Sequence, residues 1–90
     1  MKVVYKFTLN LDEEETVIED ISRSAKILSV QAQRDIPCLW VLIDTESFNW
    51  EDRTFVIKMT GEHFGDSQLN YVGTFLLDNE SFVGHVFEKI

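Results

Sequence analysis

Few residues of this chain have side chains able to carry out chemistry: one cysteine, two histidines and sixteen carboxylates. Cys38 lies within an apolar run, where a free thiol packs as a small hydrophobic side chain. The sequence has no glycine-rich phosphate loop, no nucleophile elbow, no cysteine pair and no His-Glu-x-x-His motif. We therefore predict a protein that is not an enzyme and holds no cofactor.

The residues that would have to bind a metal ion are Glu62, His63, Asp66 and His85. Nitrogen and oxygen donors suit zinc, but no two histidines stand at the close spacing typical of a zinc site. We predict no metal site, with His63 in a solvated loop and His85 in a strand, capped by a neighbour. The carboxylates of residues 12–15 are predicted to face water, because blocks of like charge repel one another.

Two large aromatic side chains stand in a polar, acidic segment. Aromatic residues in such a segment either fold back over a sheet edge or project as anchors for a partner. The covering role is favoured, because exposed apolar patches are uncommon on monomers. If the aromatic side chains are exposed, the neighbouring carboxylates would speed encounter with a basic protein. The candidate partner-binding residues are Glu46, Phe48, Trp50, Glu51 and Asp52.

A second loop, residues 61–68, supports an alternative function. Its glycines would present backbone donors to a small ligand, beside a ring able to stack on it. The candidate ligand-binding residues are Gly61, His63, Gly65 and Tyr71. The acidity of the chain disfavours an anionic ligand unless Arg34, Arg53 or Lys58 cluster locally.

The elements that would position these residues show a period of two, which is typical of half-buried strands. Strands are expected over residues 3–9, 16–21, 28–32, 38–43, 53–60, 71–77 and 82–88. Residues 13–24 could also form an amphipathic helix, but the β-branched Thr, Val and Ile of residues 16–21 favour a strand. Arg34 and Asp35 are expected to form a tight hairpin turn. Pro37 should begin a strand or lie at an edge.

Residues 38–43 are apolar on both faces and are expected to form a central strand covered on both sides. Six or seven short strands without a long helix predict an all-β fold, a small antiparallel sandwich or a partly open barrel. No linker or repeat interrupts the chain, so residues 1–90 are expected to form one domain.

The chain has a formal net charge of −8. Such acidity disfavours direct nucleic-acid binding, which needs a basic footprint, and binding to an anionic membrane surface. The longest apolar run has eight residues, 36–43, well short of the roughly 20 that span a bilayer. The first residues lack a signal-peptide pattern. A cytoplasmic location is therefore expected.

The acidic residues gather outside the expected strands, at residues 12–15, 46–52, 62–66 and 78–80. The charge is thus carried by loop tips around an apolar core. This distribution indicates a protein-binding surface for a basic partner.

Most of the chain resembles, in collinear order, an uncharacterised family of small proteins of tailed phages and prophages. The resemblance is carried by residues 27–33 (ILSVQAQ), 37–40 (PCLW), 42–44 (LID), 53–55 (RTF), 60–61 (TG), 71–75 (YVGTF) and 85–88 (HVFE). The chain departs from the family at Gly84, where Trp is typical, and at Glu62, where His is usual. The resemblance implies a phage or prophage accessory protein and names no activity.

Three functions follow as hypotheses. The first is a non-enzymatic accessory protein that binds and modulates a basic host protein, for host takeover or against host defence. The second is an oligomeric protein that binds a small ligand such as a nucleotide signal. The third is a minor virion or assembly component. Whether the chain forms a homo-oligomer stays open.

Overall fold

The computed structural model describes residues 1–66, 68–79 and 81–90. It contains seven strands, in the segments where apolar and polar side chains alternate along the sequence. The strands are β1 (Lys2–Thr8), β2 (Glu15–Ser22), β3 (Lys26–Gln33), β4 (Ile36–Asp44), β5 (Trp50–Met59), β6 (Leu69–Leu77) and β7 (Phe82–Lys89). The prediction of an all-β fold is confirmed. The expected loop 61–68 and turn 78–81 include Ser67 and Glu80, which lie outside the described residues.

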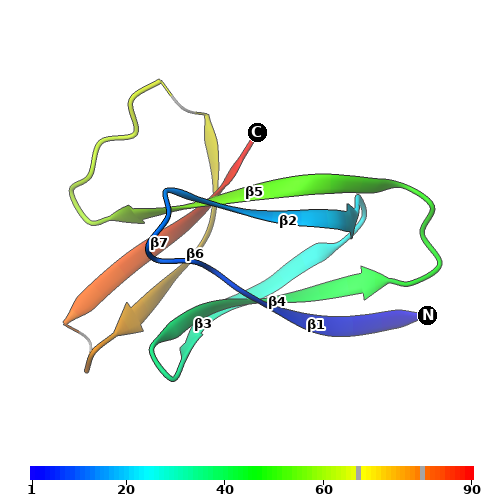
Figure 1. Cartoon of the computed structure of the whole chain (residues 1–90), viewed down its shortest axis with the longest axis horizontal. Helices are drawn as coiled ribbons and strands as arrows, with labels where there is room; N and C mark the ends of the chain where they lie inside the picture. Colours follow the sequence, from blue (N-terminus) through cyan, green and yellow to red (C-terminus); the bar gives the residue numbers. More distant parts are fainter. Residues whose placement is uncertain (67, 80) are drawn as a thin grey trace.

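The strands form two antiparallel sheets (Figure 1). The three-stranded sheet has the order β1-β4-β3, and the four-stranded sheet has the order β2-β5-β7-β6. The prediction that residues 38–43 form a central strand is confirmed, since β4 pairs on both edges. Pro37 is the second residue of β4, as expected for a residue that cannot donate to a ladder.

The core lies between the two sheets. Its fully buried members include Leu39 and Val41 of β4, Phe55 of β5 and Val86 of β7. The expectation that β4 is covered on both sides is wrong, because the second sheet covers only one face of it. Trp40 on the opposite face is therefore only half-buried.

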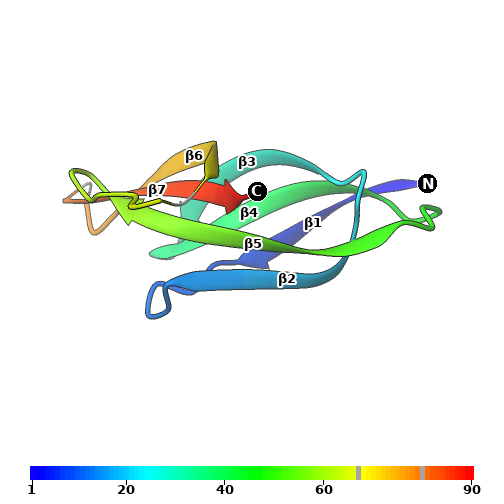
Figure 2. The same cartoon turned by 90° about the horizontal axis from the view of Figure 1, so that it is seen from above.

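The sheets approach each other closely on one side only. Here β3 packs against β6, and a Cβ built on Gly73 would lie 2.9 Å from Cγ2 of Val30. In the view of Figure 2, β3 and β6 lie near one rim of the molecule and β2 at the opposite rim. The result is a sandwich that is open between β1 and β2.

Two backbone features depart from regular strands. Arg34 and Asp35 both have positive φ, 53° and 60°, and join Gln33 to its partner Ile36, so the predicted two-residue hairpin turn is confirmed. Such a turn needs positive φ at both central residues because it must match the twist of the strands. In β2 the register shifts between Ile18 and Ile21, which makes a β-bulge.

Residues 13–24 hold β2 and no helix, so the strand prediction is confirmed and the helical alternative is wrong. Asp20 lies in the bulge with a φ of 53°. Its backbone N–H donates to Oδ1 of Asp52 over 3.1 Å. A short polar side chain tolerates this left-handed conformation better than a β-branched one.

An ion pair fixes one end of the four-stranded sheet. The guanidinium of Arg53 donates to both carboxylate oxygens of Glu88, over 2.6 and 2.7 Å, and to the carbonyl oxygen of Ala25 over 2.8 Å. The hydrogen bonds to Glu88 raise the pKa of Arg53 above its ordinary value. No helix in the described part of the chain is long and apolar enough to cross a membrane.

Candidate functional site

The loop between β4 and β5, residues 45–49, is held on both sides of Phe48. The backbone N–H groups of Glu46 and Ser47 donate to Asp44, over 3.0 Å to Oδ1 and 3.2 Å to the carbonyl oxygen. On the other side, the N–H of Arg23 donates to the carbonyl oxygen of Asn49 over 2.8 Å. The hydrogen bond from Glu46 holds the pKa of the Asp44 carboxyl below its usual range. The loop therefore has a defined shape.

Phe48 stands at the tip of this loop with 93% of its surface exposed, and Trp50 is 55% exposed. The prediction that the two rings cover a sheet edge is therefore wrong. The hydrogen bonds of Ser47 and Asn49 hold the backbone on either side of Phe48, so the loop presents the ring from an ordered backbone. In Figure 1 the loop lies at the same end of the molecule as the N-terminus.

Trp50 lines an open groove of about 330 Å³ between β1 and β2. The other large apolar side chains come from Tyr5, Phe7, Ile21 and Ile43, and Glu19 and Asp20 supply carboxylates. We call this the aromatic groove. It occupies the open side of the sandwich, where apolar side chains have no opposing strand to cover them.

The predicted carboxylates lie around the same end of the fold but differ in their contacts. The Glu46 side chain is 81% exposed, and its Oε2 lies 3.6 Å from the N-terminal nitrogen of Met1. An oxygen of Glu51 lies 3.5 Å from Nε of Arg23. Asp52 accepts the hydrogen bond that stabilises the bulge. Glu46 is thus more exposed than Glu51, and all three carboxylates also make contacts within the chain.

Sequence reasoning missed part of this site. Tyr5 and Ile43 follow the period of two and are indistinguishable from core residues until the open side of the sandwich is known. Glu19 and Asp20 line the aromatic groove because of the bulge. The positive φ of Asp20 was not visible in the sequence.

The loop that holds three of the predicted ligand-binding residues lies near the fourth, Tyr71, because the rings of Phe64 and Tyr71 both pack edge-on against Phe87, with centroids 4.7 and 5.6 Å from it. Gly61 and Gly65 have φ values of 88° and 67°, which suit the turns of an exposed loop. His63 is exposed in that loop, as predicted. None of the five main pockets in the described residues is lined by Gly61, His63, Gly65 or Tyr71.

Tyr71 also belongs to a polar network on the outer face of the four-stranded sheet. Its hydroxyl lies 2.7 Å from Oγ1 of Thr74, which lies 3.0 Å from Nδ1 of His85. Nε2 of the same histidine lies 2.8 Å from Oγ1 of Thr60. The prediction that His85 is a capped strand residue is confirmed.

The basic residues considered for an anionic ligand do not cluster. Arg53 is bound to Glu88, and Nζ of Lys58 lies 3.4 Å from Glu62. The backbone N–H of Met59 donates to the other oxygen of Glu62 over 3.0 Å and lowers the pKa of that carboxyl. Arg34 lies in the turn between β3 and β4, apart from both.

Two further features concern nucleophilic and metal chemistry, the Cys38 thiol and the side chains able to ligate a metal ion. Cys38 is 1% exposed, and its thiol donates to the carbonyl oxygen of Ile36 over 3.3 Å, so the thiol is a packed side chain. Within residues 1–66, 68–79 and 81–90, no group of three or more His, Cys, Asp or Glu side chains is arranged to hold a metal ion.

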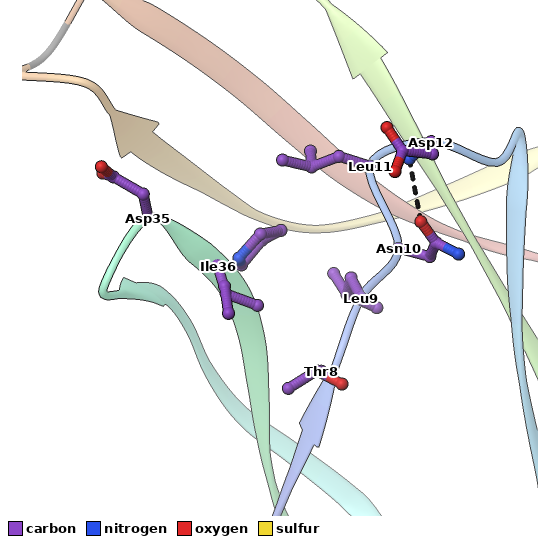
Figure 3. Close-up of a pocket in the computed structure, with 8 residues that line it drawn as sticks. Thr8, Leu9, Asn10, Leu11, Asp12, Asp35 and Ile36 are labelled. Carbon is purple, nitrogen blue, oxygen red and sulfur yellow. Dashed lines mark hydrogen bonds between the residues drawn. The ribbon is translucent and has the colours of Figure 1, made fainter.

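A hollow of about 430 Å³ lies at the far end of β1, beside the turn between β3 and β4 (Figure 3). Leu9 at its base is buried, and its N–H donates to the carbonyl oxygen of Pro37 over 2.9 Å. Asn10 shapes its rim by accepting the N–H of Asp12 over 2.9 Å. The hydrogen bond between Asn10 and Asp12 lies within the local turn, and no basic side chain is among the described residues that line this hollow.

No curated protein and no solved structure matches the chain. One family model, described as a domain of unknown function (DUF7352), matches residues 1–90. The match covers the whole chain, and the chain therefore belongs to the DUF7352 family.

Proposed function

We propose that this protein is a non-enzymatic binding module that recognises a basic protein through the loop 45–49 and the aromatic groove. The observation that carries the proposal is the exposure of Phe48 at the tip of a loop whose backbone is hydrogen bonded on both sides. A loop that is already ordered loses little conformational entropy on binding, so its contacts convert more fully into affinity.

The chemistry of the surface favours a protein partner. Exposed aromatic side chains are the residues that most often carry the binding energy of an interface. Trp50 and Tyr5 border a concave apolar surface that a partner's side chain would fill. The acidic side chains around them, with the net charge of −8, would attract a basic partner and slow the approach of acidic ones.

The resemblance to phage and prophage proteins supports a finer form of the proposal. The partner is then a host protein with a basic surface, such as a nucleic-acid-binding factor, and the binding takes place in the host cytoplasm. Modulation of that protein would serve host takeover or defence evasion. The small-ligand function has less support, because its candidate residues line none of the five pockets of the described residues.

The test is capture from bacterial lysate with quantitative mass spectrometry, followed by affinity measurement with the purified partner. The variant Phe48→Ala/Trp50→Ala should weaken binding by roughly tenfold or more, as expected of central aromatic anchors. Raising the salt from about 50 to about 500 mM should weaken wild-type binding further, because screening removes the electrostatic attraction.

The matched control is Tyr71→Ala/Leu76→Ala, which removes two exposed apolar side chains from β6, away from the loop 45–49. This variant should bind as the wild type does. Equal capture by the wild type and by the Phe48/Trp50 variant, or loss of capture only in the β6 variant, would contradict the proposal.

A further inference from the structure

The three-stranded sheet carries cations on its outer face. Its inner side chains include Tyr5 and Phe7, so Lys2 and Lys6, one residue out of phase, point outward. Lys26 of β3 lies opposite Leu42, on the same face as Lys6 and Trp40. In the sequence, residues 2–8 and 26–44 hold four bases and two acids, a net charge of +2, which leaves −10 for the rest of the chain.

These cations surround an apolar centre. Val4 is half-exposed, and Trp40 and Leu42 are half-buried on the same face. We call Lys2, Val4, Lys6, Lys26, Trp40 and Leu42 the basic face. A hollow of about 260 Å³ at one end of it is lined by Lys2, Ser24, Lys26, Leu42 and Asp44. The basic face therefore suits an acidic segment that carries an apolar side chain.

The loop 45–49 has this complementary chemistry. It presents the exposed Phe48 with Glu46 before it and Glu51 shortly after it in the sequence. The contacts of these carboxylates within the chain are ion pairs with the exposed N-terminus and the exposed Arg23, and such pairs are weak enough to exchange for others. It also adjoins the basic face, because it follows directly on Asp44, which lines the hollow. When two complementary surfaces adjoin in one molecule, a twofold axis between two copies brings each surface onto its counterpart.

We infer that two copies of this chain associate through a twofold axis at this end of the sandwich. Phe48 of each copy enters the hollow beside Leu42 of the other, and Glu46 and Glu51 face Lys2 and Lys26. The inference goes beyond the proposed function but uses the same loop. Self-association would therefore cover Phe48 and compete with partner binding, so the two events regulate each other.

Sedimentation equilibrium of the full chain at moderate and high salt tests the inference. The wild type should dimerise at about 150 mM NaCl, where screening weakens the repulsion between two chains of net charge −8, and dissociate at about 1 M, where the ion pairs between exposed side chains are screened as well. Phe48→Ala should weaken the dimer by roughly tenfold, as expected of a central aromatic anchor. Circular dichroism confirms that each variant keeps the β fold.

Charge exchange gives the sharper test. Lys2→Glu/Lys26→Glu and Glu46→Lys/Glu51→Lys should each be monomeric alone, because both reciprocal contacts become repulsive. An equimolar mixture of the two should form a heterodimer, since each loop then meets a face of opposite charge. A wild type that stays monomeric at moderate salt, or a mixture that does not associate, would overturn the inference.

Partner capture separates this inference from the proposed function. Lys2→Glu/Lys26→Glu leaves the loop and the aromatic groove intact, so it should lose the dimer and keep the partner. Binding of a single-stranded oligonucleotide or an acidic peptide to a monomeric wild type, lost in the same variant, would assign the basic face to a polyanion and overturn the dimer.

Discussion

At Gly84 the core has no room for one more carbon atom. A Cβ built there would lie 2.3 Å from Cζ of Phe75, well inside contact distance. Gly84 is buried, and its neighbour Val86 on the same face is fully buried. The ring of Phe75 therefore occupies the space that a larger residue at position 84 would need.

Gly84→Ala should therefore lower the free energy of unfolding by about 1–3 kcal/mol, the usual cost of overpacking a core. Urea denaturation measures the change. Adding Phe75→Leu to Gly84→Ala should recover part of the loss, because the smaller side chain makes space for the new methyl group. If the two substitutions are simply additive, the close contact with Phe75 does not determine the requirement for glycine.

A second prediction concerns Glu62, whose folded-state pKa is lowered by the N–H of Met59 and then by Lys58. A lowered pKa stabilises the folded state at pH values above the unfolded-state pKa of 4.5. This contribution is lost as the pH falls through the lower folded-state value. Glu62→Gln should thus be less stable than the wild type at neutral pH and lose less stability on acidification. Urea denaturation between about pH 6 and pH 3 measures both effects.

The control for this prediction is Glu13→Gln, a change in the exposed turn between β1 and β2. It should leave the acid-induced loss of stability close to that of the wild type. A Glu62→Gln variant with the wild-type pH profile would show that the hydrogen bond from Met59 does not couple protonation to folding.

At the scale of the elements, the turn between β3 and β4 is built from two residues that are not the best for it. Arg34 has a φ of 53°, and a left-handed conformation costs a long side chain more than it costs Asn. Arg34→Asn should raise the free energy of unfolding by roughly 0.5–1 kcal/mol. Urea denaturation measures this change in the free energy of unfolding. The control is Arg34→Ala, which removes the same side chain without favouring positive φ and should not raise the free energy of unfolding.

The strands were largely predictable, and the site was only partly so. Alternation in residues 3–9 and 82–88 reports which side chains face the core, because a strand repeats every two residues. The loop that presents Phe48 is held by a hydrogen bond from Arg23 to Asn49, which joins residues far apart in the sequence. Local sequence patterns contain no information on such long-range contacts. The sequence alone therefore favoured, wrongly, a Phe48 ring folded over a sheet edge.

At the scale of the whole molecule, charge opposes folding. A net charge of −8 on 90 residues repels itself more strongly in the compact state than in the unfolded chain. Added salt should therefore raise the melting temperature of dilute, monomeric protein by a few degrees, as screening weakens this repulsion. Thermal denaturation at about 10 and about 200 mM NaCl, followed by circular dichroism, measures the shift.

Glu13→Gln/Glu14→Gln removes two charges from an exposed turn. This variant should melt at a higher temperature than the wild type at low salt and gain less from added salt. A melting temperature that is independent of salt in both proteins would show that long-range repulsion contributes little to stability.

The bulge at Asp20 has a consequence for the behaviour of the protein in solution. β2 is an edge strand of its sheet, and straight edge strands act as templates for the addition of foreign strands. The bulge interrupts the regular row of donors and acceptors and places Asp20 in a left-handed conformation. Another chain cannot continue the ladder past this point. The edge of β2 is thereby a poorer template for domain swapping and fibril growth, while the side chains beside it stay accessible to a partner.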